Sequence, residues 1–525
     1  MRSKKVLINS IFGMAGYALL MLSNFVTRSV FVDQLGLSMA GVDTTFKNFL
    51  QVLSLAELGL STGLLYKLYK PIEDKDNREI KKILNFYKQA YKIIASIFMG
   101  GAVVLAFVVN LFVEDTNKSP IYISFLFILY AGDTVASYLF ANRKALIVAD
   151  QNNYIVNRND AFISLITLVS QVTLLYLTQS FIVYAVVKIV CRLIGASLIG
   201  NKFKRMYPEI ANDKSKETIS GDEKKALIKN MSAMLCHRVG GVSVTATGSA
   251  ITSKFLGTVL AGVYGNYTII TTALSQLATQ VFNGITASFG NIITVESKET
   301  IYKRFKLLYF FNYLLFCFFT VSVGVIIQPF MRFWMSNEPG SLLSDKTVIL
   351  LLCYFYVFGI RRVVLMAKDS AGLYRQDQWF AILEAVLNIV MSVAFVLWTK
   401  SIDGIILANL LSMLIIPLWT QPYLVYKHVL GQKVIGYYVR YVIYFAMTAG
   451  LFLLTNFLAE KTMSIVYGYT TNIFIELIVR AILCVSVPNL INLIVFSRTQ
   501  ELKDMIHLFL GILKKKGKKE EKVNG

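Results

Sequence analysis

The sequence predicts an all-α integral membrane protein with ~14 transmembrane helices, forming two six-helix lobes in parallel repeat plus two extra helices. The first observation is composition: 55% of the 525 residues are apolar, 16% are charged, and the mean hydropathy is +0.58. Soluble chains carry about 25% charged residues, so a soluble fold of this composition could not cover its surface. The second observation is a series of long apolar runs, and the third is the charge of the segments between them.

The apolar runs are long enough to cross the ~30 Å of membrane hydrocarbon, which takes ~20 helical residues. The two weakest are 45–66, which contains Lys47 and Glu57, and 259–282, which is rich in Thr, Gln and Asn. In chain order the predicted spans are 6–32, 45–66, 91–113, 121–140, 161–177, 181–199, 231–251, 259–282, 307–327, 348–366, 379–398, 402–424, 437–457 and 473–496.

Positive charge alternates between successive connections. Of the 53 lysines and arginines, 37 lie in every second connection, starting with the N-terminus, and only 6 lie in the others. Because cytoplasmic connections carry the excess of lysine and arginine, both termini are predicted to be cytoplasmic. The net charge of +22 therefore reflects topology, and no nucleic acid partner is expected.

The connection 200–230 is the longest and is strongly polar, so it is predicted to be a cytoplasmic linker that separates six helices from eight. The C-terminal residues include a basic block, Lys514 to Lys519, which is expected to be attracted to anionic membrane lipids. The predicted parts are an N-terminal lobe at 1–199, the linker at 200–230, a C-terminal lobe at 231–430, two further helices at 431–498 and a basic tail at 499–525.

An internal repeat links the two lobes. The pattern L-G-x-x-x-A-G-V occurs at Leu35–Val42 and again at Leu256–Val263. A second echo, Asp150-Gln151 and Asp377-Gln378, has nearly the same spacing. The second copy begins six predicted spans after the first. Because six is an even number, the two copies cross the membrane in the same orientation, as in secondary transporters with a substrate path between two lobes.

Several short motifs are spread along residues 1–430. They are Leu53-Ser54-Leu55-Ala56-Glu57-Leu58-Gly59, Tyr69-Lys70-Pro71, Tyr87-Lys88-Gln89-Ala90-Tyr91, Gly262-Val263-Tyr264-Gly265-Asn266-Tyr267, Lys368-Asp369-Ser370-Ala371-Gly372-Leu373-Tyr374, Glu384-Ala385 and Gln421-Pro422-Tyr423. With these motifs the chain resembles the oligosaccharide flippases (Wzx-type) of the polysaccharide transporter family, in the superfamily that also holds the MATE drug exporters and the lipid II flippases.

The resemblance implies a carrier in the plasma membrane that flips an undecaprenyl-pyrophosphate-type lipid-linked oligosaccharide to the outer leaflet by alternating access. Such a carrier serves capsule or exopolysaccharide synthesis. The implied partners are this substrate, membrane lipids, a polysaccharide polymerase and glycosyltransferases.

Four arginines within or near the predicted spans are candidates for the substrate path, because a guanidinium fork suits phosphate oxygens. Arg28 lies ~12 Å inside the outer boundary at 1.5 Å per residue, Arg238 lies early in the seventh span, and Arg361 and Arg362 lie late in the tenth. The alternative is that these side chains snorkel to the interface or pair with a neighbouring group.

Carboxylates and amides inside the spans add further candidates. Glu57 and Glu384 are predicted either to couple protons or to neutralise an arginine. Asn266 and Gln276 are predicted either to line the cavity or to form interhelical hydrogen bonds. Glu476 and Arg480 are four residues apart on one helix, so they are predicted to form a structural pair.

No motif in the sequence indicates an enzyme, a cofactor or a metal. There is no G-x-x-x-x-G-K-[ST] and no H-E-x-x-H, the three histidines are far apart, and the five cysteines form no C-x-x-C pair. The alternative within the same fold is a MATE-like ion-coupled drug exporter, whose cavity should be acidic. The alternative of another class is a membrane-embedded polysaccharide polymerase or acyltransferase, against which the short outer connections argue.

Overall fold

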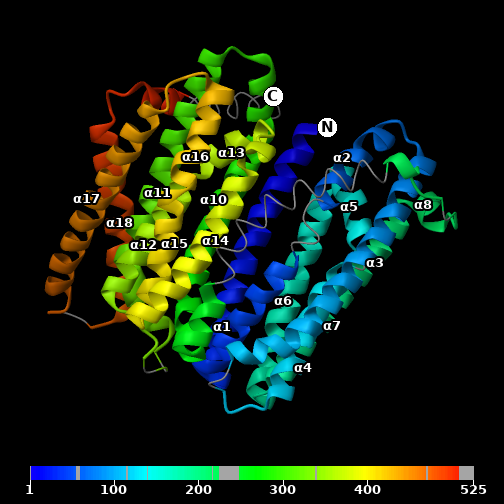
Figure 1. Cartoon of the computed structure of the whole chain (residues 1–525), viewed down its shortest axis with the longest axis horizontal. Coiled ribbons are helices and arrows are strands. Elements are labelled where there is room, and N and C mark those ends of the chain that lie inside the picture. The colour runs from blue at the N-terminus through cyan, green and yellow to red at the C-terminus, as the bar shows by residue number, and fades with distance from the viewer. Residues whose placement is uncertain are drawn as a thin grey trace, which may run out of the picture. The chain divides into compact units, whose positions relative to one another are not determined.

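The computed structural model describes residues 2–54, 60–113, 116–138, 140–215, 217–223, 248–336, 338, 340–468 and 471–507, and these residues form helices with no strand among them. The predicted site residues Glu57 and Arg238 lie outside the described residues. The helices (Figure 1) are α1 Arg2–Leu53, α2 Leu60–Glu73, α3 Asn77–Val108, η2 Val109–Phe112, α4 Pro120–Tyr138, α5 Ala141–Ala149, α6 Asn153–Thr178, α7 Phe181–Met206, α8 Pro208–Asn212, α10 Thr258–Val295, α11 Lys298–Trp334, α12 Asp345–Ile360, α13 Arg362–Ser370, α14 Tyr374–Thr399, α15 Ile402–Ile415, α16 Pro417–Val425, η3 Tyr426–Leu430, α17 Ile435–Val466 and α18 Ile473–Val495.

The all-α membrane fold is confirmed. Among the described residues, ten helical stretches are long and apolar enough to cross a membrane, and each overlaps one of the predicted spans. The other four predicted spans fall in α1 and α2, in α10, and in a segment that is mostly outside the described residues. The total of fourteen therefore stays a prediction.

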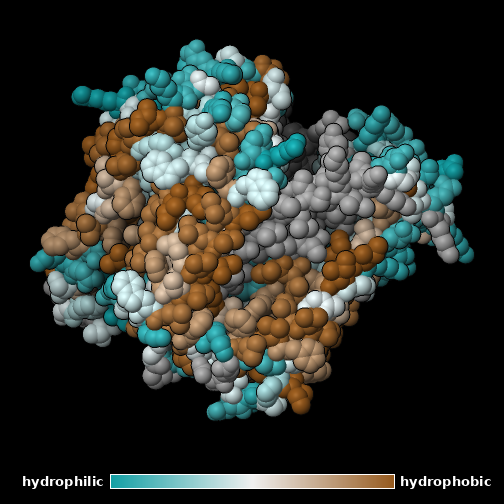
Figure 2. All heavy atoms as spheres, in the orientation of Figure 1, coloured by the Kyte–Doolittle hydropathy of each residue, from teal (hydrophilic) through white to brown (hydrophobic). Residues whose placement is uncertain are grey.

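The lipid-facing character of the helices is visible at their surface. Brown, hydrophobic side chains cover the middle of α14 and α17 in Figure 2, and teal, hydrophilic ones gather near the helix ends. On α17, for example, Val442 and Leu453 are both exposed. Soluble proteins rarely leave apolar patches of this extent in water, so this surface is suited to hydrocarbon.

One predicted connection is helical. Residues 33–44 were expected to join the first two spans, but they belong to α1, which bends at Gly36 with a φ of 80°. A residue with a side chain rarely adopts such a φ, whereas glycine adopts it without strain. Within this segment the Ser38 hydroxyl lies 2.8 Å from that of Thr258, so the polar side chain has a hydrogen-bond partner although the backbone is helical.

The chain divides into two compact units, residues 1–265 and 266–525. In the second unit α17 and α18 pack against α11, and tyrosines and phenylalanines of α11 and α17 make up much of the core. The predicted boundaries of lobes, linker and tail stay predictions.

The internal repeat also appears in the helix boundaries. Equivalent boundaries differ in residue number by a constant amount, the same that separates Leu35 from Leu256, and we call this difference the repeat offset. This repeat offset relates α5 to α13 and α6 to α14 at both ends, and it relates the first residues of α3 and α7 to those of α11 and α15. Local geometry follows the same offset: Gly36 and Gly257 both have positive φ, and so do Gln179 and Lys400, which end α6 and α14.

The echo of Asp150 and Asp377 is not part of this repeat. Its spacing is larger than the repeat offset, which places Ala371 rather than Asp377 at the position of Asp150. Asp150 follows α5, whereas Asp377 lies in the first turn of α14. The dipeptide echo was therefore a coincidence of composition.

The predicted topology is testable by cysteine labelling in intact cells, after the native cysteines have been replaced. Single cysteines at Asn117 and Lys346, both exposed, should react with a membrane-impermeant maleimide, and one at Lys214, also exposed, should react only after permeabilisation. Labelling of Lys214→Cys in intact cells at the rate of Asn117→Cys would contradict the predicted sidedness.

Candidate functional site: a cationic cavity in the first unit

A cavity of about 340 Å³ lies within the first unit, between α1, α4, α5, α6 and α7. Its size is in the range of small-molecule sites, roughly 300–1,000 Å³. The residues that line it are Leu20, Ser23, Asn24, Thr27, Lys47, Ser137, Phe140, Lys144, Asp160, Ile163, Ser164, Thr167, Leu168, Gln171, Tyr184, Lys188, Arg192, Gly195 and Ala196.

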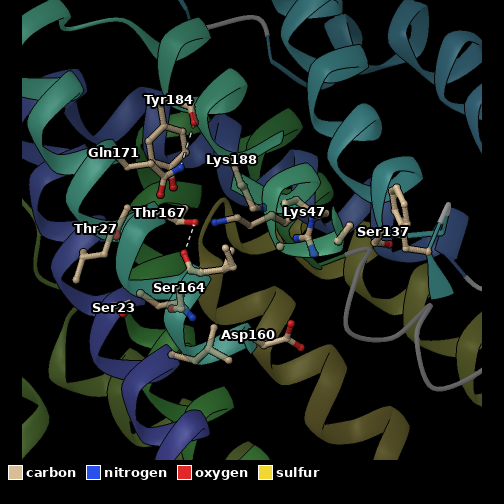
Figure 3. A pocket seen from close by; sticks show the side chains of 18 of the residues that line it. Ser23, Thr27, Lys47, Ser137, Asp160, Ser164, Thr167, Gln171, Tyr184 and Lys188 are labelled. Carbon is tan, nitrogen blue, oxygen red and sulfur yellow. Dashed lines mark hydrogen bonds between the residues drawn. The ribbon is translucent and has the colours of Figure 1, made fainter. Parts of the chain in front are cut away.

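Close packing of α6 and α7 fixes one wall of the cavity. Gly195 allows this approach, because a Cβ there would lie 2.8 Å from a side-chain carbon of Ile163. Gln171 is buried on α6 and donates a hydrogen bond of 3.1 Å to the carbonyl of Tyr184 on α7. Ser164 and Thr167 add hydroxyl groups to this wall, and Ser23 of α1 adds another to the cavity (Figure 3).

Four cationic side chains enter the cavity, and among the described residues that line it Asp160 is the one carboxylate. Lys47 of α1 and Lys188 of α7 extend towards the same space (Figure 3). All four cations, the other two being Lys144 and Arg192, are partly exposed, at 34–52% of the side chain. They therefore keep contact with solvent in the cavity.

Each of these cations forms an ion pair with a carboxylate. The Nζ of Lys47 lies 2.8 Å from Asp43, and the Nζ of Lys144 lies 2.9 Å from Asp160. Asp133 accepts from Arg192 and also lies 3.1 Å from the Nζ of Lys188. With Arg28, which also pairs with Asp43, five cations face three carboxylates. The cluster is net positive, as an anion site requires.

The repeat provides an internal comparison for these charges. At the repeat offset, every charged residue of the cluster has a neutral counterpart in the second copy. Lys47 corresponds to Thr268, Lys144 to Leu365, Lys188 to Asn409, Arg192 to Met413, Asp43 to Tyr264, Asp133 to Tyr354, Asp160 to Ala381 and Arg28 to Ser249. The counterparts of α5, α6 and α7 in the second copy therefore form without these charges.

Arg28 lies behind the cavity rather than among its lining residues. It is 5% exposed and donates to the Ala40 carbonyl at 3.1 Å, to Asp43 at 2.9 Å and to the Gly262 carbonyl at 3.2 Å. These contacts join the part of α1 before the bend at Gly36 to the part after it. Asp43 also accepts from Lys47 at 2.8 Å, and because Lys47 lines the cavity, Asp43 connects Arg28 to it. A direct substrate contact by Arg28 stays a prediction.

The structure explains the repeated L-G-x-x-x-A-G-V pattern. A Cβ on Gly41 would lie 1.8 Å from the Thr258 carbonyl oxygen, and one on Gly262 would lie 2.3 Å from the Leu37 carbonyl oxygen. The start of α10 and the second part of α1 therefore pack backbone to backbone, as small residues permit in membrane helices.

The second unit brings together two of the predicted arginine and glutamate candidates. Arg361 and Glu384 are both buried, with 3.9 Å between nitrogen and oxygen, and Arg361 also donates to Gln421 at 3.0 Å. Arg362 lies over the ring of Phe358, 5.7 Å from its centroid.

The two amide candidates lie in different settings. Asn266 is buried and its amide lies 3.5 Å from the sulfur of Met335, whereas Gln276 is exposed. The roles predicted for Arg361, Arg362, Glu384, Asn266 and Gln276 in substrate binding stay predictions.

Glu476 and Arg480 are in contact on α18. The Nε of Arg480 donates to Glu476 at 3.0 Å, and both side chains are buried. Each has a further partner from another helix: Arg332 donates to Glu476 at 3.2 Å, and Arg480 donates to Glu460 at 2.9 Å. The pair is thus the centre of a four-residue network that joins α11, α17 and α18.

Sequence reasoning missed the cations of the cavity as site residues. Lys188 and Arg192 stand inside the predicted span 181–199, and Lys47 stands inside 45–66. A charge within an apolar span was the signal, since such residues usually face a cavity or one another. Their convergence depends on which faces of α1 and α7 meet, and hydropathy does not provide this information.

Comparison with known proteins establishes the fold. No family model and no curated protein sequence matches the chain. An inward-facing multidrug resistance MATE family transporter of the MOP superfamily is similar in structure, with a TM-score of 0.60 and 12% identity over 80% of this chain and 99% of that one.

The lipid II flippase MurJ in an inward closed conformation gives a TM-score of 0.60 and 14% identity over 95% of this chain and 100% of that one. A MATE structure in a bent conformation gives 0.50 and 13% over 80% and 94%. The chain is therefore a multi-pass membrane protein with the fold that MATE transporters and the lipid II flippase MurJ share.

Proposed function

We propose that the chain flips polyprenyl-pyrophosphate-linked oligosaccharide repeat units from the cytoplasmic to the outer leaflet by alternating access, for capsule or exopolysaccharide synthesis. The observation that carries the proposal is the cationic cavity, whose charges have neutral counterparts in the second repeat. A diphosphate cannot enter hydrocarbon without charge compensation, and lysine and arginine supply charge-assisted hydrogen bonds to phosphate oxygens.

The ion pairs of the cavity suit transient binding of an anion. Asp43 is shared by Lys47, Arg28 and Tyr130, and Asp133 is shared by Lys188 and Arg192. Either lysine can therefore turn towards a phosphate while its carboxylate keeps a cationic partner. An unpaired buried carboxylate, which would be costly, is avoided in both the loaded and the empty cavity.

The polar side chains of the cavity support recognition of a sugar next to the diphosphate. Ser23, Ser164 and Thr167 carry hydroxyl groups, and Gln171 and Tyr184 add an amide and a phenol. Sugar hydroxyls both donate and accept hydrogen bonds, as these groups do. In this proposal the polyprenyl chain stays in lipid, and only the headgroup enters the cavity.

The alternative functions fit this cavity less well. A MATE-like exporter of cationic drugs would need a cavity that attracts cations, whereas a net positive cluster repels them. A membrane polymerase or acyltransferase that uses a histidine base or a cysteine nucleophile would find neither among the described residues that line the cavity. The fold similarity to the lipid II flippase MurJ supports a lipid-linked substrate.

The proposal includes a location and partners. The chain would reside in the plasma membrane with both termini in the cytoplasm, as the charge of the connections indicates. Glycosyltransferases would supply the lipid-linked unit at the inner leaflet, and a polysaccharide polymerase would consume it at the outer leaflet.

The proposal is tested by complementation of a flippase-deficient host with the double variant Lys47→Thr/Lys188→Asn. Each replacement is the residue at the equivalent position of the second repeat, and both carboxylates keep an arginine. Losing two charge-assisted hydrogen bonds, about 1.5–3 kcal/mol each, should lower surface polymer at least tenfold at unchanged protein level.

The matched control is Lys47→Arg/Lys188→Arg, which keeps both charges and should retain most export. Normal export by the Thr/Asn variant at normal abundance would contradict the proposed role of the cavity. Drug resistance conferred by the wild-type chain, together with failure to restore polymer, would favour the exporter instead.

A further inference from the structure

A second cavity, of about 570 Å³, lies in the first unit where α3, α5, α7, α8 and residues 213–215 meet. Six of the side chains that line it are cationic and one, Asp213, is acidic. The cations are Lys81, Lys88, Lys92, Arg143, Lys204 and Lys214. None of them lines the cavity proposed above for the substrate.

Most of this positive charge is unneutralised. Among the described residues, no carboxylate forms an ion pair with Lys88, Lys92 or Lys204, and all three are exposed. The Asp213 carboxylate accepts from the N–H and the hydroxyl of Ser215, at 2.7 and 2.9 Å, and these hydrogen bonds lower the pKa of Asp213. Lys81 donates to the carbonyls of Ile210 and Asp213 and so shapes the floor.

An apolar stripe on α3 continues directly from the cationic cavity. Beyond Lys92 the exposed apolar side chains include Ile93, Ile97, Val104 and Phe107, which recur at the three- and four-residue spacing of one helix face. Their exposed fractions are 60–75%. Positive charge followed by apolar surface matches a lipid, with its phosphate at the membrane boundary and its acyl chain alongside the helix.

The second repeat shows the same face when it is covered by protein. Lys88 corresponds to Tyr309 and Lys92 to Tyr313 on α11. Their rings pack against α17, with centroid distances of 5.0 Å from Tyr309 to Tyr437 and 4.1 Å from Tyr313 to Tyr444. Lys204 corresponds to Val425, which is fully buried.

The first copy thus has cations where the second has an aromatic interface with an additional helix. We propose that this surface of the first unit binds an anionic glycerophospholipid. The headgroup phosphate occupies the cavity at Lys88, Lys92 and Lys204, and an acyl chain lies along Ile93 and Ile97. The cavity lies at the end of α3 whose connections carry the excess of lysine and arginine, so the lipid comes from the leaflet on that side. This site does not depend on the identity of the transported molecule.

The bound lipid also has a structural consequence. Residues 208–215 and Glu217 lie along the first turns of α3, where Asn85 donates to the carbonyls of Ser215 and Glu217 and Arg78 pairs with Glu217. A phosphate between α3 and Lys204 of α7 would connect the two helices that border this segment. Lipid binding should therefore raise the melting temperature of the purified chain.

The test titrates the purified, delipidated full chain with dioctanoyl phosphatidylglycerol in neutral detergent, with thermal shift and native mass spectrometry as readouts. The triple variant Lys88→Gln/Lys92→Gln/Lys204→Gln should bind about a hundredfold more weakly, since each lysine near an anionic lipid contributes roughly fivefold. The matched control Lys427→Gln/Lys433→Gln/Lys503→Gln removes three exposed lysines elsewhere and should bind like the wild type. The variant Lys88→Arg/Lys92→Arg/Lys204→Arg should also bind, which separates loss of charge from misfolding.

Two further arms identify the ligand. Ile93→Ala/Ile97→Ala should weaken phosphatidylglycerol binding severalfold, because the acyl chain loses apolar contact, and dioctanoyl phosphatidylcholine should bind at least tenfold more weakly than phosphatidylglycerol. Equal affinity of the triple Gln variant and the wild type would overturn the proposal. Inorganic phosphate binding as tightly as the lipid, with no effect of the isoleucine variant, would show a soluble anion site and would overturn it as well.

Discussion

Gly41→Ala should abolish recovery of folded protein. The added Cβ would lie 1.8 Å from the carbonyl oxygen and 2.7 Å from the carbonyl carbon of Thr258, and both are backbone atoms that cannot rotate away. Overpacking a core usually costs about 1–3 kcal/mol, and a backbone clash of this depth should exceed that range because the start of α10 must move away from α1. The measurement is the yield of monodisperse protein by size-exclusion chromatography.

The matched control is Gly100→Ala on α3. Gly100 is also a helix-interior glycine, but nothing lies within 4 Å of its Cβ position, so alanine should stabilise the helix by about 0.5–1 kcal/mol. Normal yield and melting temperature for Gly41→Ala would show that the two backbones are not packed as described. The repeated A-G-V would then need another explanation.

Breaking the buried pair of Lys368 and Asp377 should be the second largest effect. The two side chains are in contact and are 0% and 1% exposed. Lys368→Ile alone would leave the Asp377 carboxylate buried without the ammonium, and Asp377→Val alone would leave the ammonium. Removing one partner of a buried pair costs about 3–5 kcal/mol, so each single variant should lose most of its folded protein.

The double variant Lys368→Ile/Asp377→Val should recover normal yield. The equivalent residues of the first repeat are Ile147 and Val156, both buried, so the same helix positions accept an apolar pair. Replacing a buried ion pair by well-packed apolar residues is often neutral or stabilising. Additive losses in the double variant, measured by melting temperature, would show that the pair is needed for more than mutual neutralisation.

Much of the fold could be predicted from the sequence because the membrane imposes helix length and composition. Each of the ten described stretches that meet these criteria overlaps a predicted span, and the glycine pattern at Gly36 and Gly257 supplied the repeat offset that the helix boundaries follow. The boundaries of α1 could not be predicted. Polar groups on both sides of its bend form hydrogen bonds with Thr258 and Gly262. These two residues are distant in the chain, and no local sequence pattern connects them to α1.

The cavity was harder to predict because its residues come from five helices. Arg28 was chosen for its depth in the first span, and its guanidinium is held by Ala40, Asp43 and Gly262 behind the cavity. The accessible charge is carried instead by the four cations that line the cavity, Lys47, Lys144, Lys188 and Arg192. Besides the charges within apolar spans, the sequence contained a second signal: alignment of the two repeats at the repeat offset shows charged residues in the first copy opposite neutral ones in the second.

The central claim is that Lys47 and Lys188 bind the diphosphate of a lipid-linked substrate. The most direct measurement is the affinity of the purified full chain for farnesyl pyrophosphate, with farnesol as the uncharged control, in the wild type and in Lys47→Thr/Lys188→Asn. The account predicts that the wild type prefers the pyrophosphate at least tenfold and that the variant loses this preference while its melting temperature is unchanged. Equal affinity of the well-folded variant and the wild type for farnesyl pyrophosphate would contradict the account.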